Sequence, residues 1–121
     1  MPKELTKQKK KTENAVKLYC KVRDNYICQH CGKVLKKNNC HGSHVIPVSA
    51  GNQFRFDPVN IKTLCFHCHI NWWHKNPVES GEWFKKKFPE RHKYLFGKPR
   101  ETVKFTVDEL KEIEKKYKNL I

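Results

Sequence analysis

The chain has 121 residues, which fits one domain with a modest core, and its 37% of hydrophobic residues predicts that something besides the core stabilises it. Lys and Arg total 26 against 12 Asp and Glu, a formal net charge of +14 that favours a polyanion as partner. No apolar run is long enough to span a membrane and none follows the basic N-terminus, so we expect a cytoplasmic protein without a membrane segment.

The first third of the chain is predicted to hold a tail, a helix and a tight turn. Residues 1–12 are rich in Lys and predict a disordered basic tail. A helix is expected over residues 13–23, because Val16 and Cys20 fall on one face. A knuckle-like turn follows at residues 26–33.

The middle of the chain predicts short strands followed by helices. Apolar runs indicate strands at residues 44–48 and 54–56, separated by a turn. A second turn at residues 57–60 leads to a helix expected over 65–75, which stops before a proline. Another helix is expected over residues 79–87.

The C-terminal segment predicts an amphipathic helix. Thr106 and Glu109 have the spacing of a capping box, and apolar residues beyond them recur on one face. We therefore expect a disordered tail at 1–12, a metal-stabilised domain at 13–100 and a C-terminal amphipathic helix at 101–121. The expected fold class is α+β.

Four cysteines are arranged as two CxxC pairs. The pairs are Cys28–Cys31 and Cys65–Cys68, with 33 residues between them. Each pair places two thiolates on a tight turn, and two such turns can close a tetrahedral site for Zn²⁺. Because all four ligands are Cys, the site should be structural, and metal binding would add to folding free energy. The other cysteines stand alone: we expect Cys20 to be buried and Cys40 to be an incidental thiol.

A second pattern is threaded through the cysteines. His44-x-x-Pro47 precedes Asn60-x-x-x-Leu-Cys-x-x-Cys-His69. This pattern resembles the HNH nuclease motif, and residues 15–96 resemble phage HNH proteins of the NinG recombination-endonuclease type. The resemblance implies a ββα-metal nuclease core, in which two strands and a helix hold the catalytic residues. It also implies a metal-dependent DNA endonuclease, located in the host cytoplasm if a phage encodes it.

The resemblance assigns a role to each of three residues. It makes His44 the general base, which a neutral imidazole can be near pH 7. It makes Asn60 a brace for the loop that orients this base, although Asn is also an ordinary turn residue. It makes His69 a ligand of a catalytic divalent cation, Mg²⁺, Mn²⁺ or Ni²⁺, and predicts products with 5′-phosphate ends.

One position departs from the family pattern. Many HNH enzymes carry Asp or His directly before the base as a second metal ligand, whereas this chain has Ser43. His41 is a candidate replacement, because in an extended chain it points to the same side as Ser43. His74 is the other candidate, although residues five apart share an α-helical face poorly. The departure leaves open a weakened or inactive enzyme.

Other features are assigned by the chemistry of single residues. Trp72 and Trp73 are expected to pack in the core rather than stack on bases. His30, His67 and His92 are expected to be ordinary surface or core residues. Basic residues near the motif are expected to contact DNA phosphates without reading sequence. They are Arg55, Lys75, Lys85, Lys86, Lys87 and Arg91.

The sequence leaves two other functions open. A zinc-knuckle module could bind DNA without cutting it, but would need neither His44 nor His69. An RNA-binding zinc ribbon is also conceivable, although the Trp pair is the only aromatic signal for it. The DNA could be duplex or branched, and the oligomeric state is not predicted.

Overall fold

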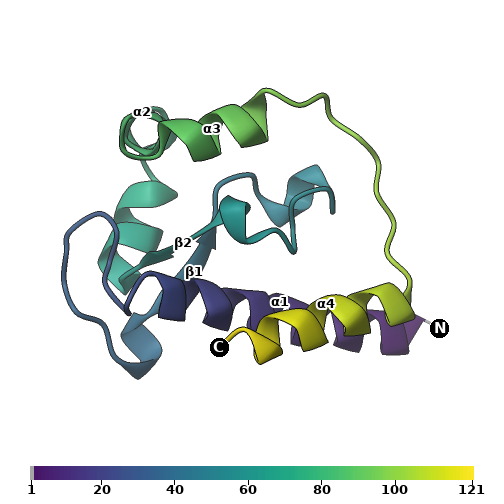
Figure 1. Cartoon of the computed structure of the whole chain (residues 1–121). Helices are drawn as coiled ribbons and strands as arrows, with labels where there is room; N and C mark the ends of the chain where they lie inside the picture. Colours follow the sequence, from purple (N-terminus) through teal and green to yellow (C-terminus); the bar gives the residue numbers. More distant parts are fainter. Residues whose placement is uncertain (1) are drawn as a thin grey trace.

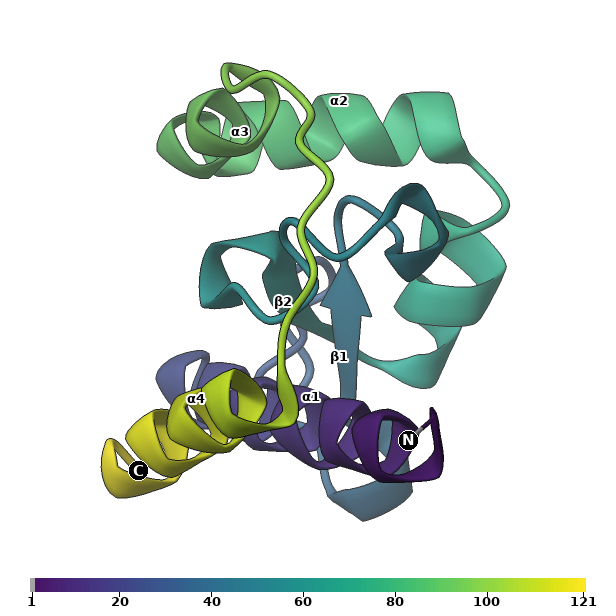
Figure 2. The ribbon, with the colours of Figure 1, turned by 90° about the vertical axis from the view of Figure 1, so that its right-hand side faces the viewer.

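The computed structural model describes residues 2–121 as two helical layers with a small sheet between them (Figures 1 and 2). The elements are α1 (Pro2–Arg23), β1 (His41–His44), β2 (Ile61–Leu64), a π-helical segment η4 (His67–Trp73), α2 (Pro77–Lys87), α3 (Pro89–Phe96) and α4 (Val107–Asn119). Helices α1 and α4 lie side by side on one side of the sheet, and α2 and α3 lie on the other. This mixture of helices and a two-stranded sheet agrees with the expected α+β class.

The N-terminal segment is helical, so the prediction of a disordered tail is wrong for the described residues 2–12. The buried face of α1 repeats every four residues as Gln8, Thr12, Val16 and Cys20. Its first two members are polar, so no apolar stripe is visible in the sequence. Both side chains form hydrogen bonds to helix α4. Thr12 donates to the carbonyl of Leu110 at 2.9 Å, and Gln8 donates to Glu114.

Helix α4 completes this face of α1. Gln8 donates hydrogen bonds to Thr12 Oγ1 at 3.1 Å and to Glu114 Oε1 at 2.8 Å. The predicted capping box is confirmed: Thr106 Oγ1 accepts from Glu109 N, and Glu109 Oε1 accepts from Thr106 N. The amphipathic helix is also confirmed, although it begins at Val107 and residues 101–106 approach it in extended form.

The sheet is an antiparallel pair whose strands differ from those expected. Strand β1 covers 41–44 rather than 44–48, and its partner β2 is 61–64. The segment 54–56 is not a strand but a series of turns. Its alternating Phe residues are both buried, as a strand would have them, yet Phe54 and Phe56 enter two different clusters on either side of the sheet.

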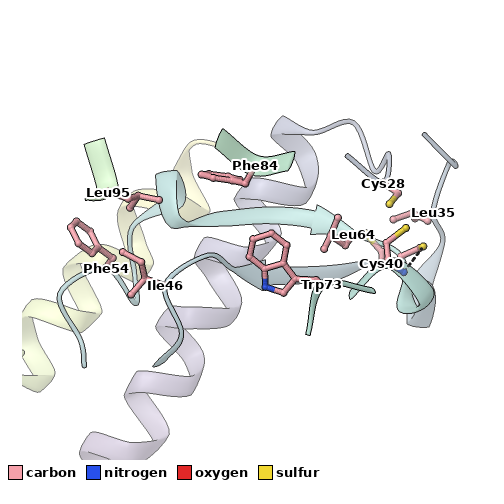
Figure 3. Close-up of a cluster of buried hydrophobic side chains, with 11 residues drawn as sticks. Cys28, Leu35, Cys40, Ile46, Phe54, Leu64, Trp73, Phe84 and Leu95 are labelled. Carbon is pink, nitrogen blue, oxygen red and sulfur yellow. Dashed lines mark hydrogen bonds between the residues drawn. The ribbon is translucent and has the colours of Figure 1, made fainter. Parts of the chain in front are cut away.

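The larger of the two clusters includes Leu64 of β2 and connects the cysteines to the layer formed by α2 and α3. Figure 3 shows Cys28, Leu35 and Cys40 near one end of it and Phe54 and Leu95 near the other. Cys20 is fully buried, as expected, and burial raises the pKa of its thiol to about 12. Cys40 is buried in the larger cluster as a small apolar residue, so its thiol has a packing role.

The segment 77–96 forms two consecutive helices where one was expected. Helix α2 begins two residues earlier than predicted, with Pro77 in its first turn. Helix α3 was missed, because it is only eight residues long and starts at Pro89. Trp73 and Phe84 are buried in the large cluster, and Trp72 packs against it, so the expected core role of the Trp pair is confirmed. Among the described residues, no helix has the length and apolarity needed to cross a membrane.

Candidate metal centre and histidine cleft

The four paired cysteines converge on one point. Their Sγ atoms all lie within 4.8 Å of one another, and those of Cys31 and Cys65 are 3.9 Å apart. A tetrahedral Zn²⁺ with bonds of about 2.3 Å separates its sulfur ligands by about 3.8 Å, so the spacing fits such an ion. The first pair sits on a turn closed by a bridge between Ile27 and Val34, and Gly32 supplies the φ of +80° that this turn requires.

Backbone amides prepare this centre for thiolates. Burial by itself would raise the pKa of Cys28, but N–H groups of Cys31, Cys65 and His30 outweigh it and lower that pKa to about 7. Burial and the neighbouring thiols raise the pKa of Cys68 instead. Four thiols this close cannot all ionise without a cation among them, which is what a bound metal ion provides.

His30 was expected to be an ordinary histidine, and it contacts the cysteine cluster. Its Nδ1 lies 3.3 Å from Cys68 Sγ, and its ring stacks on Trp72 with centroids 3.6 Å apart. Trp72 in turn donates a hydrogen bond to Glu79 at 2.7 Å. His30 therefore links the cluster to the aromatic side chains beneath it. Its position next to Cys31 in a CxxC pair was the available sequence signal.

The helix expected at 65–75 is π-helical through most of its length, and this changes which residues share a face. In a π-helix residue i bonds to residue i+5, and His74 N donates to the carbonyl of His69 at 3.2 Å. His69 and His74 thus lie on the same face, with their Nε2 atoms 3.1 Å apart. The objection that these residues are five apart holds only for an α-helix.

His41 reaches His69 from the other side of the ring. His41 Nδ1 lies 2.9 Å from His69 Nδ1, and His41 Nε2 lies 2.9 Å from the carbonyl oxygen of Asn38. A carbonyl only accepts, so His41 carries its proton on Nε2 and accepts at Nδ1. His69 must then carry its proton on Nδ1, which leaves the Nε2 lone pair on the side of His74. Burial and repulsion from His74 and His41 lower the pKa of His69 to about 4.

His44 is held by a carbonyl in the same way. Its Nε2 donates a hydrogen bond to the carbonyl of Arg55 at 3.0 Å, which leaves a lone pair on Nδ1. Burial lowers the pKa of His44 below its usual 6.5, the Arg55 carbonyl opposes this shift, and the positive charge of Lys17 adds to it. The imidazole is therefore neutral near pH 7.

Asn60 is completely buried at the start of β2, behind the strand that carries His44. Its side chain bonds the main chain of Ile46 and donates to the carbonyl of Phe54 at 3.1 Å, and its own carbonyl accepts from Val45 N at 2.8 Å. It thus fixes the residues that follow His44 and the segment that leads to Arg55. The bracing role that the family resemblance assigns to Asn60 stays a prediction.

Four histidines, His44, His69, His74 and His92, line one open cleft of about 730 Å³, the histidine cleft. Lys17, Trp73 and Lys85 also line it, whereas His41 does not. Gly42 forms part of its floor and lies against α1: a Cβ on this residue would sit 2.6 Å from Lys17 Cγ. The absence of a side chain there lets α1 approach β1 and brings Lys17 to the cleft.

Ser43 does not face the histidine cleft as a ligand would. It is buried, and its Oγ accepts a hydrogen bond at 3.0 Å from Lys62, a fully buried lysine. The Lys62 ammonium nitrogen lies 3.3 Å above the Trp73 ring, and burial lowers the pKa of Lys62 well below its usual 10.5. No sequence pattern indicates this buried amine, since a single Lys within a short apolar strand is normally exposed.

The basic residues expected to bind DNA have different surroundings. Lys87 donates to the carbonyl of Gln29 at 2.5 Å, and Arg91 packs over the Phe88 ring at 4.3 Å. Lys85 lines the histidine cleft, whereas Lys75 and Lys86 are exposed outside it. Arg55 forms a salt bridge with Glu13 at 2.7 Å.

Comparison with known proteins identifies a family over nearly the whole chain. Residues 2–121 match the family model described as Bacteriophage Lambda NinG protein. The match includes α4 and the N-terminal helix, which extend beyond the stretch 15–96 that carries the sequence resemblance. No curated protein and no solved structure matches the chain. The chain therefore belongs to the family of the bacteriophage lambda NinG protein.

Proposed function

We propose that this chain is a metal-dependent HNH-type endonuclease that hydrolyses DNA phosphodiester bonds in phage recombination or DNA processing. The observation that carries the proposal is the histidine cleft, where His44 and the pair His69–His74 open into one space. A module that only binds DNA has no need for His44, His69 and His74 to open into one cleft. The charge of +14 supports a polyanionic substrate.

The catalytic cation is assigned to His69 and His74. Their Nε2 atoms are 3.1 Å apart, and two nitrogens at right angles on an ion with bonds of about 2.1 Å are about 3.0 Å apart. Both residues line the histidine cleft, so water and phosphate could complete the coordination. A divalent cation held there would stabilise negative charge on the phosphate and on the leaving 3′ oxygen.

His41 is assigned a positioning role behind this pair. It accepts from His69 Nδ1 and is itself fixed by the Asn38 carbonyl, so it selects the tautomer of His69 that offers Nε2 to the cleft. Hydrogen bonds of this kind orient metal-binding histidines in many proteins. His69 and His74 are therefore the ligands of the ion, and His41 orients His69 without binding the ion itself.

His44 is assigned the role of general base. Its Nδ1 takes a proton from a water molecule as the water oxygen bonds to phosphorus. The bond from phosphorus to the 3′ oxygen breaks, and that oxygen gains a proton from solvent. The products are a 5′-phosphate and a 3′-hydroxyl, and His44 returns its proton to solvent. Arg55 keeps the imidazole oriented through its carbonyl.

The ion at the four cysteines is assigned as structural Zn²⁺. Four thiolates at tetrahedral spacing are its usual closed ligand set. The cluster joins the knuckle before β1 to the residues after β2, and His69 follows Cys68 directly. Zinc would thereby fix the start of η4 and with it the histidine cleft.

The test is a cleavage assay on supercoiled plasmid with Mg²⁺, Mn²⁺, Ni²⁺ or EDTA. The wild type should nick or linearise the plasmid only with a divalent metal, and His44→Ala should be slower by about 100- to 10,000-fold. His67→Ala is the matched control, because His67 is exposed and does not line the histidine cleft. Absence of cleavage of plasmid and branched DNA with every metal, with DNA binding intact, would refute the proposal and favour a zinc-knuckle binding module.

A further inference from the structure

A second cavity, of about 700 Å³, runs along the outer face of α1. Its lining contains Lys7, Lys10, Lys11, Lys17 and Arg55 against one carboxylate, that of Glu13. We call it the α1 groove. The segment that forms most of the groove was expected to be a disordered basic tail, whereas it is part of helix α1. The strong positive charge of the groove favours an anionic ligand.

The α1 groove adjoins the histidine cleft, because the two cavities share a lining residue. Lys17 lines both cavities. Arg55 joins them as well, since its side chain lines the groove while its carbonyl accepts the hydrogen bond from His44. Glu13 binds Arg55 at 2.7 Å and Lys17 at 3.0 Å, which fixes these two cations at the junction. A chain of anionic groups lying in the groove is therefore led to the general base.

The outer part of the α1 groove carries the lysines that can meet a ligand. Lys7, Lys10 and Lys11 are exposed, and none of them forms a salt bridge within the described residues. From Lys7 to Lys17 the helix rises about 15 Å. A duplex aligned with α1 would present roughly four phosphates of one strand over this length, at about 3.4 Å of duplex axis per nucleotide.

From this geometry we infer that the α1 groove binds the sugar-phosphate backbone of the DNA and guides the scissile strand into the histidine cleft. The inference rests on the proposed nuclease function for the identity of the ligand, but the groove and its charge do not depend on catalysis. The groove lysines would bind phosphates, so they should supply affinity and register without sequence preference. The helix that holds them is positioned by α4, through Gln8 and Thr12.

The test neutralises the groove lysines and compares them with lysines elsewhere. The groove variant is Lys7→Gln, Lys10→Gln and Lys11→Gln together. The control is Lys111→Gln, Lys115→Gln and Lys116→Gln together on α4. These three lysines are exposed and line neither cavity, and their substitution removes the same charge. Binding of a fluorescein-labelled duplex is measured by anisotropy in EDTA, with the zinc centre loaded beforehand, over a series of salt concentrations.

The groove variant should bind more weakly by on the order of 100-fold at about 0.1 M salt. The slope of log K against log salt should become shallower by roughly 0.9 for every phosphate that the variant no longer neutralises. The control variant should keep a slope within about 0.9 of the wild-type value. Equal weakening of binding in the two variants would overturn the inference, because binding would then follow net charge alone.

A small substrate separates this inference from the proposed function. Bis(p-nitrophenyl) phosphate is a phosphodiester with no strand to be guided, so the groove variant should hydrolyse it at the wild-type rate while losing DNA cleavage. Loss of both activities would overturn the guiding role. If the wild type cleaves neither substrate, the nuclease proposal fails, and the anisotropy comparison still decides whether the groove binds DNA.

Discussion

Asn60 holds the main chain of Ile46 at both of its polar groups: its Oδ1 accepts from Ile46 N at 2.8 Å, and its Nδ2 donates to Ile46 O at 3.0 Å. Asn60→Asp keeps the shape but sets a carboxylate against two carbonyls, those of Ile46 and Phe54. We expect a loss of at least about 2 kcal/mol in unfolding free energy, measured in urea. Asn14→Asp, on the exposed face of α1, should change it little, and equal stability of the two variants would contradict the bracing role.

The positioning role of His41 predicts graded effects on metal affinity. His41→Ala removes the acceptor for His69 Nδ1 and should weaken Mn²⁺ binding at the cleft by about 10- to 100-fold, measured by calorimetry on the zinc-loaded protein. His41→Asn should recover part of this loss, because its Oδ1 stands where His41 Nδ1 accepts. If His41→Ala bound Mn²⁺ as the wild type does while His69→Ala did not, the orienting role would be wrong and the ligand assignment would stand.

The pH dependence of cleavage should follow His44. The base works only when unprotonated, and its pKa is lowered from 6.5 by burial and by Lys17 and Lys62, against Glu13 and the Arg55 carbonyl. Single-turnover rates should therefore stay level from neutral pH to below 6.5 and then fall in acid. Lys17→Gln removes a repelling charge, so the pKa of His44 should rise and the acid limb should move toward neutral pH. An unmoved limb would argue against His44 as the titrating base.

Metal removal should unfold the region around the cysteines. The purified protein should hold one tightly bound metal per chain, and Co²⁺ substituted for it should show the absorption of a tetrahedral thiolate site. Cys65→Ser should lose this metal and the cooperative thermal transition. Cys20→Ala is the control: Cys20 is buried away from the cluster, so this variant should keep the metal. A folded, metal-free Cys65→Ser protein would contradict the structural assignment.

Gly42 and Gly81 both line the histidine cleft, and substitution by Ala should lower the unfolding free energy at Gly42 and raise it at Gly81. Gly42→Ala places a Cβ 2.6 Å from Lys17 Cγ and 3.0 Å from Lys17 Cβ, atoms too near the helix backbone to move cheaply. We expect a loss of about 1–3 kcal/mol and slower cleavage, because α1 must shift away from β1. Gly81→Ala meets nothing within 4 Å in the middle of α2 and should stabilise by about 0.5–1 kcal/mol. Thermal melts of the two variants check both signs.

Local chemistry made part of the molecule predictable. The CxxC pairs specify their own turns and ligand set, so the metal centre could be located from spacing alone. The capping box of α4 was equally local. What could not be predicted depends on distant partners. The polar members of the buried face of α1, Gln8 and Thr12, form hydrogen bonds with residues of α4 about a hundred positions away.

The histidine cleft shows the same division. The family resemblance assigned roles to His44, Asn60 and His69, but the pairing of His69 with His74 depends on η4 being π-helical, which periodicity does not reveal. In η4 the backbone hydrogen bonds join residues five apart rather than four apart. This places His74 beside His69, so that His74 lines the cleft and His41 does not. Lys62 was missed for a related reason: its partners, Ser43 and the Trp73 ring, come together only in the folded sheet.

The pairing of α1 with α4 also sets an order of events during synthesis. Leu110 and Glu114, which satisfy the polar face of α1, are translated after every residue of the histidine cleft and the cysteine cluster. A nascent chain thus carries the cleft histidines and the four cysteines before α4 is available to support the lysine-bearing helix α1. The α1 groove would therefore take its final shape later than the metal site, because its supporting helix is synthesised after the cysteines.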